Sequence, residues 1–327
     1  TDAAAASMSH VAWDGFAHHD TIFPLFLFIA GVSFPYSVAK QRAGGMSEGR
    51  IYAKIVRRGL TLVVLGMVYN GLFKLDFENL RIASVLGRIG LAWSIAAVLY
   101  LNFGVKTRAA IAVAVLAGYG ALSALVAAPD AAGAGPLTFE GNLAGYIDRQ
   151  FLPGKLIYGS FDPEGLLSTV PAVVTAMLGM FTGEFVRRGD IRGGRKTLWM
   201  AAAAAALLAA GLAFSGVLPV NKKLWSSTFV CVVGAYSLGM FALFYYLIDV
   251  RGWRRWTLFF RVVGLNSITI YLAQRIVGFG RISDFFLGGI ASKCPEAVAA
   301  VISSAGYVAV CWLFLYFLYR KNVFLKV

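Results

Sequence analysis

Residues 21–39 read TIFPLFLFIAGVSFPYSVA, an apolar run without one charged side chain. A helix rises about 1.5 Å per residue, so about 20 such residues cross the roughly 30 Å hydrocarbon core of a bilayer. The run is continuous and does not alternate between apolar and polar residues, which excludes a strand of a membrane β-barrel. It therefore predicts a membrane-spanning helix.

Eight further runs of this kind follow along the chain. Only the stretch between the fourth and fifth runs, residues 129–164, is a long loop, and it contains a predicted short helix near residues 141–152. The sequence thus predicts an all-α, polytopic integral membrane bundle, a single domain over residues 1–327 with an external segment at 1–20. The nine predicted spans are residues 21–39, 55–73, 82–101, 109–128, 165–186, 198–217, 224–248, 258–279 and 297–319.

The composition supports a lipid-facing surface. Hydrophobic residues make up 59% of the chain and charged residues 14%, whereas a soluble domain has about 25% charged residues. Basic residues outnumber acidic ones, 30 to 16, but they lie in short turns between apolar runs. Because no basic run with interleaved aromatic residues stands in a polar context, the predicted partner is the lipid bilayer and not nucleic acid.

The basic residues also predict the orientation. Twenty of the 30 fall on one side of the predicted spans, in the turns after the first, third, fifth and seventh spans and at the C-terminus. By the positive-inside rule this side, with the C-terminus, is cytoplasmic, and residues 1–20 are external. A helix preceding Thr1 would make ten spans with both ends cytoplasmic. The external loops contain no Asn-x-Ser/Thr glycosylation acceptor, which favours a bacterial inner membrane.

All three histidines lie in the external segment, just before the first span. Imidazole moves protons near neutral pH, so His10, His18 and His19 are candidates for proton transfer. The alternative is an amphipathic anchor at the membrane interface. No Cys/His spacing completes a metal site around the adjacent His18, His19 and Asp20, and no metal is predicted.

Arg81 and Arg88 open the third predicted span. Seven residues apart on a helix, they would share one face with Arg88 about 10 Å deeper. At that depth a guanidinium faces a polar cavity or a partner, or else it reaches back to the external surface. Asn266 and Ser267 place further polar groups inside the eighth predicted span. A polar interior of this kind suits transporters, channels and membrane enzymes alike.

Other polar groups cluster at the external boundary. Asp162 and Glu164 in FDPEG could hold an amine or a hydroxyl-bearing substrate. Alternatively, Asp162 before Pro163 is typical of a helix N-cap, and Glu164 favours a helix dipole. The turn LPVNKKLWSS also contains the candidate residues Asn221 and Trp225. Its Lys222 and Lys223 break the positive-inside trend, which indicates a ligand there.

Five blocks in the same order resemble the transmembrane acyltransferases of the heparan-alpha-glucosaminide N-acetyltransferase group and their bacterial NagX/DUF5009-type relatives. They extend from residue 10 to residue 273 and cover nearly the whole chain. They read HVAWDGFAHHDTIFPLFLFIAGVSFPYS, RIASVLGRIGLAW, AGYIDRQFLPGKLIYGSFDPEGLLSTV, VNKKLWSSTFV and GLNSITIYLA.

The resemblance implies transfer of an acetyl group from cytosolic acetyl-CoA to an amino sugar on the external side. It places His10 on the family's catalytic histidine, and Asp20 on the aspartate that precedes Phe-Pro. Asp14 departs from the family, which has Asn at that position, so acceptor contacts can differ. A first helix with an S-L-D-x-L-R-G motif, expected for the family, is not in these residues. The other positions that match the family's motifs are Arg81, Arg88, Glu164, Asn266 and Ser267.

An acetyltransferase of this kind needs a general base, an oxyanion partner and a donor site. His10 would take the amine proton, and Asp20 could hold its tautomer, while an acetyl-histidine intermediate is an alternative. The resemblance allows a homodimer. Two rival functions stay open: a sugar transporter or permease, and an O-acyltransferase of a cell-surface glycan. The phosphates of acetyl-CoA are expected near cytosolic basic pairs, either Arg57 and Arg58 or Arg187 and Arg188.

Overall fold

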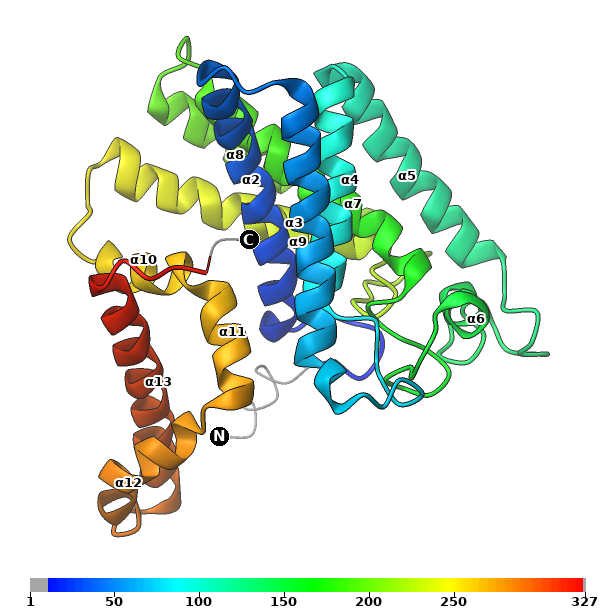
Figure 1. The fold of residues 1–327 in the computed structure, drawn as a ribbon. Coiled ribbons are helices and arrows are strands. Elements are labelled where there is room, and N and C mark those ends of the chain that lie inside the picture. Colours follow the sequence, from blue (N-terminus) through cyan, green and yellow to red (C-terminus); the bar gives the residue numbers. More distant parts are fainter. Residues whose placement is uncertain (1–10, 326–327) are drawn as a thin grey trace. The chain divides into compact units, whose positions relative to one another are not determined.

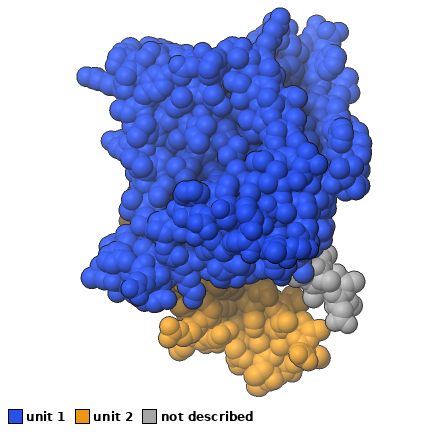
Figure 2. Space-filling model, turned by 90° about the vertical axis from the view of Figure 1, so that its right-hand side faces the viewer, with its two compact units in different colours: residues 1–250 blue, residues 251–327 orange. Residues whose placement is uncertain are grey.

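The computed structural model describes residues 11–325, so His10 lies outside the described residues. The chain divides into two compact units, residues 1–250 and 251–327 (Figure 2). Each unit is described by itself below. The predicted single domain over residues 1–327 stays a prediction.

Apart from two isolated β-bridges, all regular secondary structure in the described residues of the first unit is helical (Figure 1). The order of its helices, including short 3-10 turns and a final π turn, follows the predicted spans. They are η1 (His18–Thr21), α2 (Ile22–Ala43), α3 (Glu48–Tyr69), η2 (Leu72–Lys74), α4 (Val85–Asn102), α5 (Val105–Leu125), α6 (Leu143–Phe151), α7 (Leu166–Arg187), α8 (Gly193–Ala213), α9 (Ser227–Tyr245) and η3 (Tyr246–Val250).

The second unit contains four helices, of which the last two form an antiparallel pair. Its helices are α10 (Thr257–Leu265), α11 (Ser267–Ile276), α12 (Phe279–Ala291) and α13 (Glu296–Arg320). Gly306 lets α13 lie close to α12, because a Cβ there would stand 2.4 Å from Leu287 Cδ1 and Ser283 Oγ.

The all-α polytopic fold predicted from the sequence is confirmed. Among the described residues, seven helices are long and apolar enough to cross a membrane, two fewer than the nine predicted. α3 has the length, but Lys54, Arg57 and Arg58 precede its apolar part and leave too few consecutive apolar residues to cross a membrane. The eighth predicted span, 258–279, is instead the two short helices α10 and α11, with a break at Asn266.

Three glycines bring the backbones of α2 and α7 into direct contact. A Cβ on Gly31 would stand 2.2 Å from the Ala176 carbonyl oxygen, and one on Gly179 would stand 2.0 Å from that of Phe28. Gly183, one turn further along α7, faces Val32 in the same way at 2.2 Å. Small residues four apart permit this close approach between membrane helices. We call this contact the glycine seam; it fixes the start of α2 relative to the start of α7.

The alternation of α2 to α9 gives the first unit two distinct ends. One end, here the loop end, holds residues 70–84, 126–165 and 214–226 together with the start of α2. The other, here the basic end, holds the turns at residues 44–47, 103–104 and 188–192. Candidate acceptor residues of this unit fall at the loop end; of the candidate donor residues, Arg187 and Arg188 fall at the basic end, and Arg57 and Arg58 fall near the middle of α3.

Candidate functional site

The segment after His10 is held by the turn at residues 219–226. The Asp14 carboxylate accepts a hydrogen bond from the Asn221 side-chain amide at 3.0 Å, and Gly15 N donates to the Val220 carbonyl at 2.8 Å. Lys223 Nζ donates to the Ala12 carbonyl at 2.5 Å. Asn221 is fully buried, whereas Asp14 is exposed. The predicted residues Asp14, Asn221 and Lys223 are therefore neighbours at the surface of the loop end.

Asp20 lies in η1 and is almost completely buried. One of its carboxylate oxygens forms an ion pair with Lys222 Nζ at 3.1 Å, and the other accepts from Ala17 N at 3.2 Å. An orienting role of Asp20 toward His10 stays a prediction, because His10 lies outside the described residues. Lys222 was not among the predicted site residues. The sequence marked Lys222, like Lys223, only as a basic residue that breaks the positive-inside trend, and it did not predict this ion pair.

Trp225 connects this surface layer to the interior. It has a left-handed backbone, with φ of 52°, and its side chain is buried. Its indole Nε1 donates to Thr175 Oγ1 at 3.2 Å, and its ring packs edge-on against Phe23 at 5.0 Å. The guanidinium carbon of Arg88 lies 5.0 Å from the Trp225 ring centroid, a cation–π contact.

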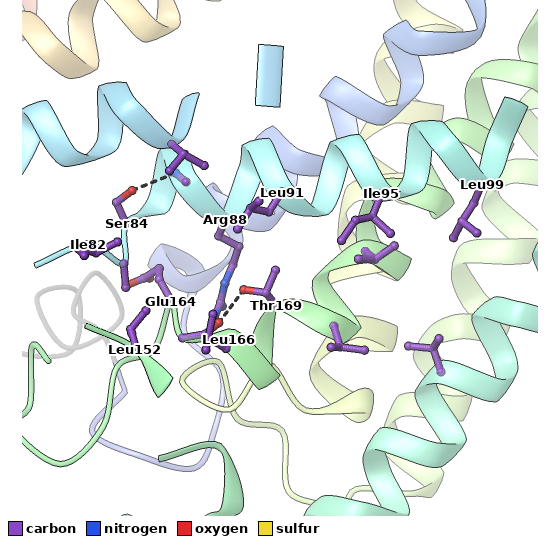
Figure 3. Close-up of a pocket in the computed structure, with 17 residues that line it drawn as sticks. Ile82, Ser84, Arg88, Leu91, Ile95, Leu99, Leu152, Glu164, Leu166 and Thr169 are labelled. Atoms are coloured by element: carbon purple, nitrogen blue, oxygen red, sulfur yellow. Dashed lines mark hydrogen bonds between the residues drawn. The ribbon is translucent and has the colours of Figure 1, made fainter. Parts of the chain in front are cut away.

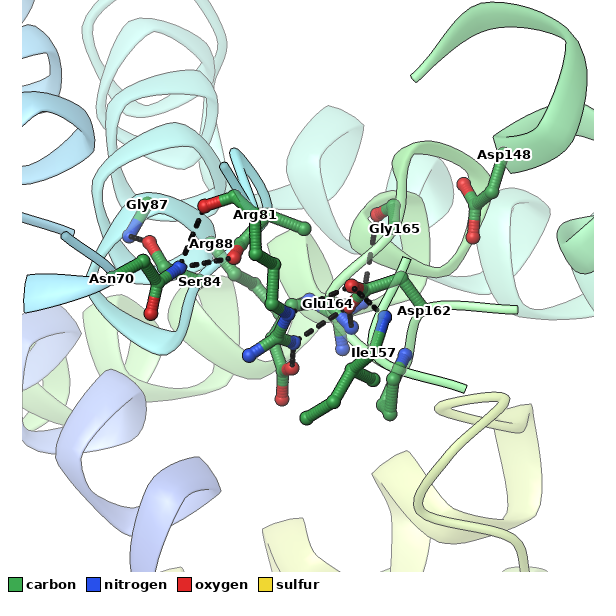
Figure 4. A network of polar contacts seen from close by, with 12 residues as sticks. Asn70, Arg81, Ser84, Gly87, Arg88, Asp148, Ile157, Asp162, Glu164 and Gly165 are labelled. Carbon is green, nitrogen blue, oxygen red and sulfur yellow. Dashed lines mark hydrogen bonds and ion pairs between the residues drawn. The ribbon is translucent and has the colours of Figure 1, made fainter. Parts of the chain in front are cut away.

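Arg81 forms an ion-pair network with the FDPEG segment (Figure 4). Its Nε and Nη2 donate to both oxygens of Asp162 at 2.8 and 2.7 Å, and Nη2 also pairs with Glu164. Burial alone would lower the pKa of Arg81, but its hydrogen bond to Asp162 and the two negative charges raise it. The guanidinium is therefore permanently charged.

The expectation that Arg81 stacks with Arg88 on one helix is wrong. α4 begins at Val85, with the Ser84 hydroxyl accepting from Gly87 N as N-cap, and Arg81 lies before it in a bridge to Gly154. Asn70 at the end of α3 holds this extended stretch, since its amide donates to the Arg81 and Ala83 carbonyls. The two arginines still converge on the same segment, from a loop and from a helix.

Arg88 is only 2% exposed and does not reach back to the surface. Its Nη2 donates to the Ser168 hydroxyl and weakly to the Gly165 carbonyl at 3.5 Å. Its Nε and Nη1 have no hydrogen-bond partner among the described residues. The side chain lines a cavity of about 440 Å³ that Glu164 also lines (Figure 3).

Capping of α7 also differs from the expectation. Asp162 is not its N-cap, because the helix begins at Leu166. The Asp162 carboxylate is fully buried. It accepts hydrogen bonds from Arg81 and from the backbone N–H groups of Ile157 and Glu164. The first turn receives instead the carboxylate of Asp148, from α6, which accepts from Leu166 N at 2.8 Å.

Asp148 was missed by the sequence reasoning, and its environment is unusual. Its second oxygen is buried without a hydrogen-bond partner in the described part of the chain and lies against Gly165, where a Cβ would be 1.9 Å away. Burial raises the pKa of Asp148 to about 6, although the hydrogen bond from Leu166 N opposes this. The only sequence signal was a single acidic residue on the apolar side of a short amphipathic helix.

Of the residues predicted to bind the donor, Arg187 and Arg188 lie at the basic end, whereas Arg57 and Arg58 lie near the middle of α3. Arg57, Arg187 and Arg188 are exposed, and Arg188 pairs with Asp190 at 2.5 Å. Arg58 is half-buried, with its guanidinium 4.3 Å from the Trp93 ring centroid and its Nε without a partner in residues 11–325. The sequence reasoning missed Arg108, which is buried between the rings of Tyr100 and Phe181 and pairs with Glu184 at 2.6 Å.

Asn266 and Ser267 belong to the second unit and are not placed relative to this site. Asn266 ends α10 and is 1% exposed; its amide donates to the Val262 carbonyl at 3.4 Å, and its Oδ1 has no partner among the described residues. Over residues 11–325, no group of three or more His, Cys, Asp or Glu side chains could hold a metal ion.

The fold and the buried charges at the loop end define the class: an all-α, polytopic membrane protein with a charged interior. No family model matches the chain. Over 97% of its length it is similar to the heparan-alpha-glucosaminide N-acetyltransferases of Homo sapiens and Mus musculus, with 27% and 26% identity. The chain spans about half the length of these curated relatives, 55% and 56% respectively. The resemblance inferred from the five sequence blocks is confirmed.

Proposed function

We propose that this protein transfers an acetyl group from acetyl-CoA to the amine of a glucosamine-like sugar. The observation that carries the proposal is the similarity, over 97% of the chain, to relatives named as N-acetyltransferases of a glucosaminide. By the positive-inside rule the basic end faces the cytoplasm of a bacterial cell and the loop end faces outward. The donor then binds at the basic end and the acceptor at the loop end.

The acceptor site is formed by segment 11–20 and the turn at 219–226. Asp14 is exposed, and the Asn221 amide fixes its carboxylate, so it can accept hydrogen bonds from an ammonium or hydroxyl group of a sugar. Lys223, which donates to the Ala12 carbonyl, also places its Nζ 4.5 Å from the ring centroid of Tyr158, which is 44% exposed. A fixed carboxylate and an aromatic surface suit a polar ring with an amine substituent.

The chemistry assigned to His10 is general base catalysis. The neutral amine nitrogen attacks the thioester carbonyl carbon, a C–N bond forms, and the C–S bond breaks. The imidazole accepts the proton lost by nitrogen and returns it to the departing thiolate, giving free coenzyme A. Asp20, fixed by Lys222, is the proposed positioning residue for His10.

The donor site combines two predicted residues with one that the structure adds. Arg58 and Arg187 lie over the rings of Trp93 and Tyr36, and buried Arg108 lies on the same side of the unit. Charge-assisted hydrogen bonds from guanidinium groups suit the phosphates of the nucleotide. Arg58 and Arg108 each have a buried Nε without a partner in the described chain, but Arg108 is already paired with Glu184, so Arg58 is the strongest single candidate.

The decisive experiment measures transfer from radiolabelled acetyl-CoA to glucosamine by purified wild type, His10→Ala and His18→Ala. His18 is the matched control, because it is an exposed histidine of the same segment with no assigned role. Transfer that is lost in His10→Ala and kept in His18→Ala, with acetyl-CoA still bound by both, supports the proposal. Wild-type activity retained in His10→Ala refutes the assigned base. If the wild type neither transfers acetyl nor binds acetyl-CoA, the proposed function is wrong, and sugar uptake by proteoliposomes then tests the transporter.

The same preparation distinguishes the acceptor chemistry. Mild alkaline hydroxylamine releases an O-linked acetyl group and leaves an N-linked one in place. A product that resists hydroxylamine supports the amide, and a labile product assigns the site to a glycan O-acyltransferase.

A further inference from the structure

The cavity beside Arg88 is a groove with one polar end and a long apolar remainder (Figure 3). Arg88, Ser84, Thr169 and Glu164 gather at one end. The rest of the groove follows α4 toward Leu99 between α5 and α7, and its lining there is aliphatic: Leu91, Ile95, Leu99, Val115, Val170 and Val173.

The groove is open along its side. Several of its aliphatic residues are among the exposed apolar side chains of the first unit, with Ile95 48% exposed, Leu91 43% and Val170 42%. α4 and α7 are both helices long and apolar enough to cross a membrane. An opening flanked by exposed aliphatic side chains on such helices faces bilayer hydrocarbon, so its occupant can enter from the membrane.

The length of the groove matches one leaflet. From Arg88 to Leu99, α4 rises about 16 Å, roughly half of the 30 Å hydrocarbon core. A single acyl chain whose polar head stays near the level of Arg88 would therefore end near the middle of the bilayer.

The polar end has hydrogen-bond donors to offer. Arg88 is 2% exposed, no carboxylate lies within ion-pair distance of it in the described chain, and its Nε and Nη1 lack partners. Leaving donors of a buried charged group unsatisfied is unfavourable, so a ligand oxygen at this position is favoured. Glu164 also lines the groove, but its carboxylate is already paired with Arg81.

We propose that the groove binds one acyl chain of a membrane glycerophospholipid, with the ester and phosphate oxygens of the lipid accepting hydrogen bonds from Arg88. A pantetheine arm of acetyl-CoA fits the same space less well, because its two amides would meet only aliphatic side chains beyond Thr169. An alkyl chain needs no hydrogen-bond partner there. The inference concerns lipid binding and stands apart from the proposed acetyl transfer.

The test uses the full chain in nanodiscs containing phosphatidylglycerol with a photoreactive diazirine in one acyl chain. After illumination, digestion and mass spectrometry should locate the label on α4 and α7 at the groove-lining residues. Ile95→Trp fills the groove from an exposed position and should lower labelling there at least about fivefold. Leu208→Trp is the matched control, because Leu208 is a comparably exposed residue of α8, 42% exposed, away from the groove; it should leave groove labelling unchanged.

Arg88→Gln then tests the polar end, and Val170→Trp provides a second filled groove should Arg88→Gln not fold. Arg88→Gln should lower groove labelling at least about threefold, while labelling elsewhere on the chain stays constant. Two results would overturn the proposal: groove labelling that is equal in wild type and both tryptophan variants, or groove labelling that acetyl-CoA competes away. The second result would assign the groove to the donor arm. None of these readouts depends on acetyl transfer, so failure of the proposed function leaves the test intact.

Discussion

Replacing Asp148 by Asn should flatten the dependence of stability on pH between pH 4 and pH 8. Burial raises the pKa of this carboxyl from its ordinary 3.8 to about 6 in the folded protein. A raised pKa means that the fold favours the protonated form. The contribution of Asp148 to stability is therefore fully present below about pH 4 and is lost as the pH rises through 6.

The size of the effect follows from the two pKa values. At 1.36 kcal/mol per pH unit, the difference between about 6 and 3.8 corresponds to roughly 3 kcal/mol. Asn keeps the acceptor for Leu166 N, but it places an amide N–H where the second oxygen has no partner in the described chain, a pH-independent cost of about 1–3 kcal/mol. The variant should thus be less stable than wild type at pH 4 and about equally stable at pH 8.

The measurement is the apparent melting temperature of detergent-solubilised wild type and Asp148→Asn across this pH range. At about 2–4 °C per kcal/mol, the difference between the two proteins should change by roughly 6–12 °C. Asp130→Asn is the control: the exposed Asp130 has its pKa lowered by the hydrogen bond from Arg149, so its effect should be small and opposite in sign. Melting curves of wild type and Asp148→Asn that run parallel across the range would show that Asp148 is ionised at no cost and would refute the reasoning.

Three further substitutions test the packing and the two ends of the site. Gly179→Ala forces a methyl group onto the Phe28 carbonyl and should cost about 1–3 kcal/mol in thermal unfolding, whereas Gly118→Ala, with open space around it, should cost nothing. Arg81→Met leaves the buried Asp162 carboxylate without its cation and should destabilise the protein by about 3 kcal/mol. Asp162→Asn in the Arg81→Met background should recover part of this loss. If the effects of the two substitutions were strictly additive in a double-mutant cycle, that would argue against the ion pair. Arg58→Met should raise the KM for acetyl-CoA about 10-fold or more with a smaller change in kcat. The control is Arg50→Met, because Arg50 is an exposed arginine on the same helix; it should leave the KM unchanged. Equal effects of the two substitutions would exclude Arg58 from the donor site.

The lengths of the apolar runs predicted the fold because backbone groups inside hydrocarbon must form their hydrogen bonds within their own segment. A long apolar run in a bilayer is therefore a helix. The prediction failed where charge or a local break intervened. The basic residues of α3 and the interruption at Asn266 reduced nine predicted spans to seven.

The site was predictable in part for a different reason. Motif resemblance identified candidate residues that lie within one block of sequence, such as Asp14 in the segment after His10. Contacts between blocks were not identified: Asp148 with Leu166 and Asp20 with Lys222 join residues 18 and 202 positions apart. Periodicity cannot report such pairs, because each partner carries no local signal of the other.

The glycine seam between α2 and α7 sets which parts of the molecule can vary. α2 carries the segment with Asp14 and Asp20, and α7 carries the segment with Asp162 and Glu164, so a backbone-to-backbone contact fixes these two segments against each other. Side-chain changes in segment 11–20 or in the turn at 219–226 therefore leave the framework intact. Under the proposed function, new acceptor specificities are expected from mutating those loops alone, whereas Gly31, Gly179 and Gly183 are the positions at which libraries should be held constant.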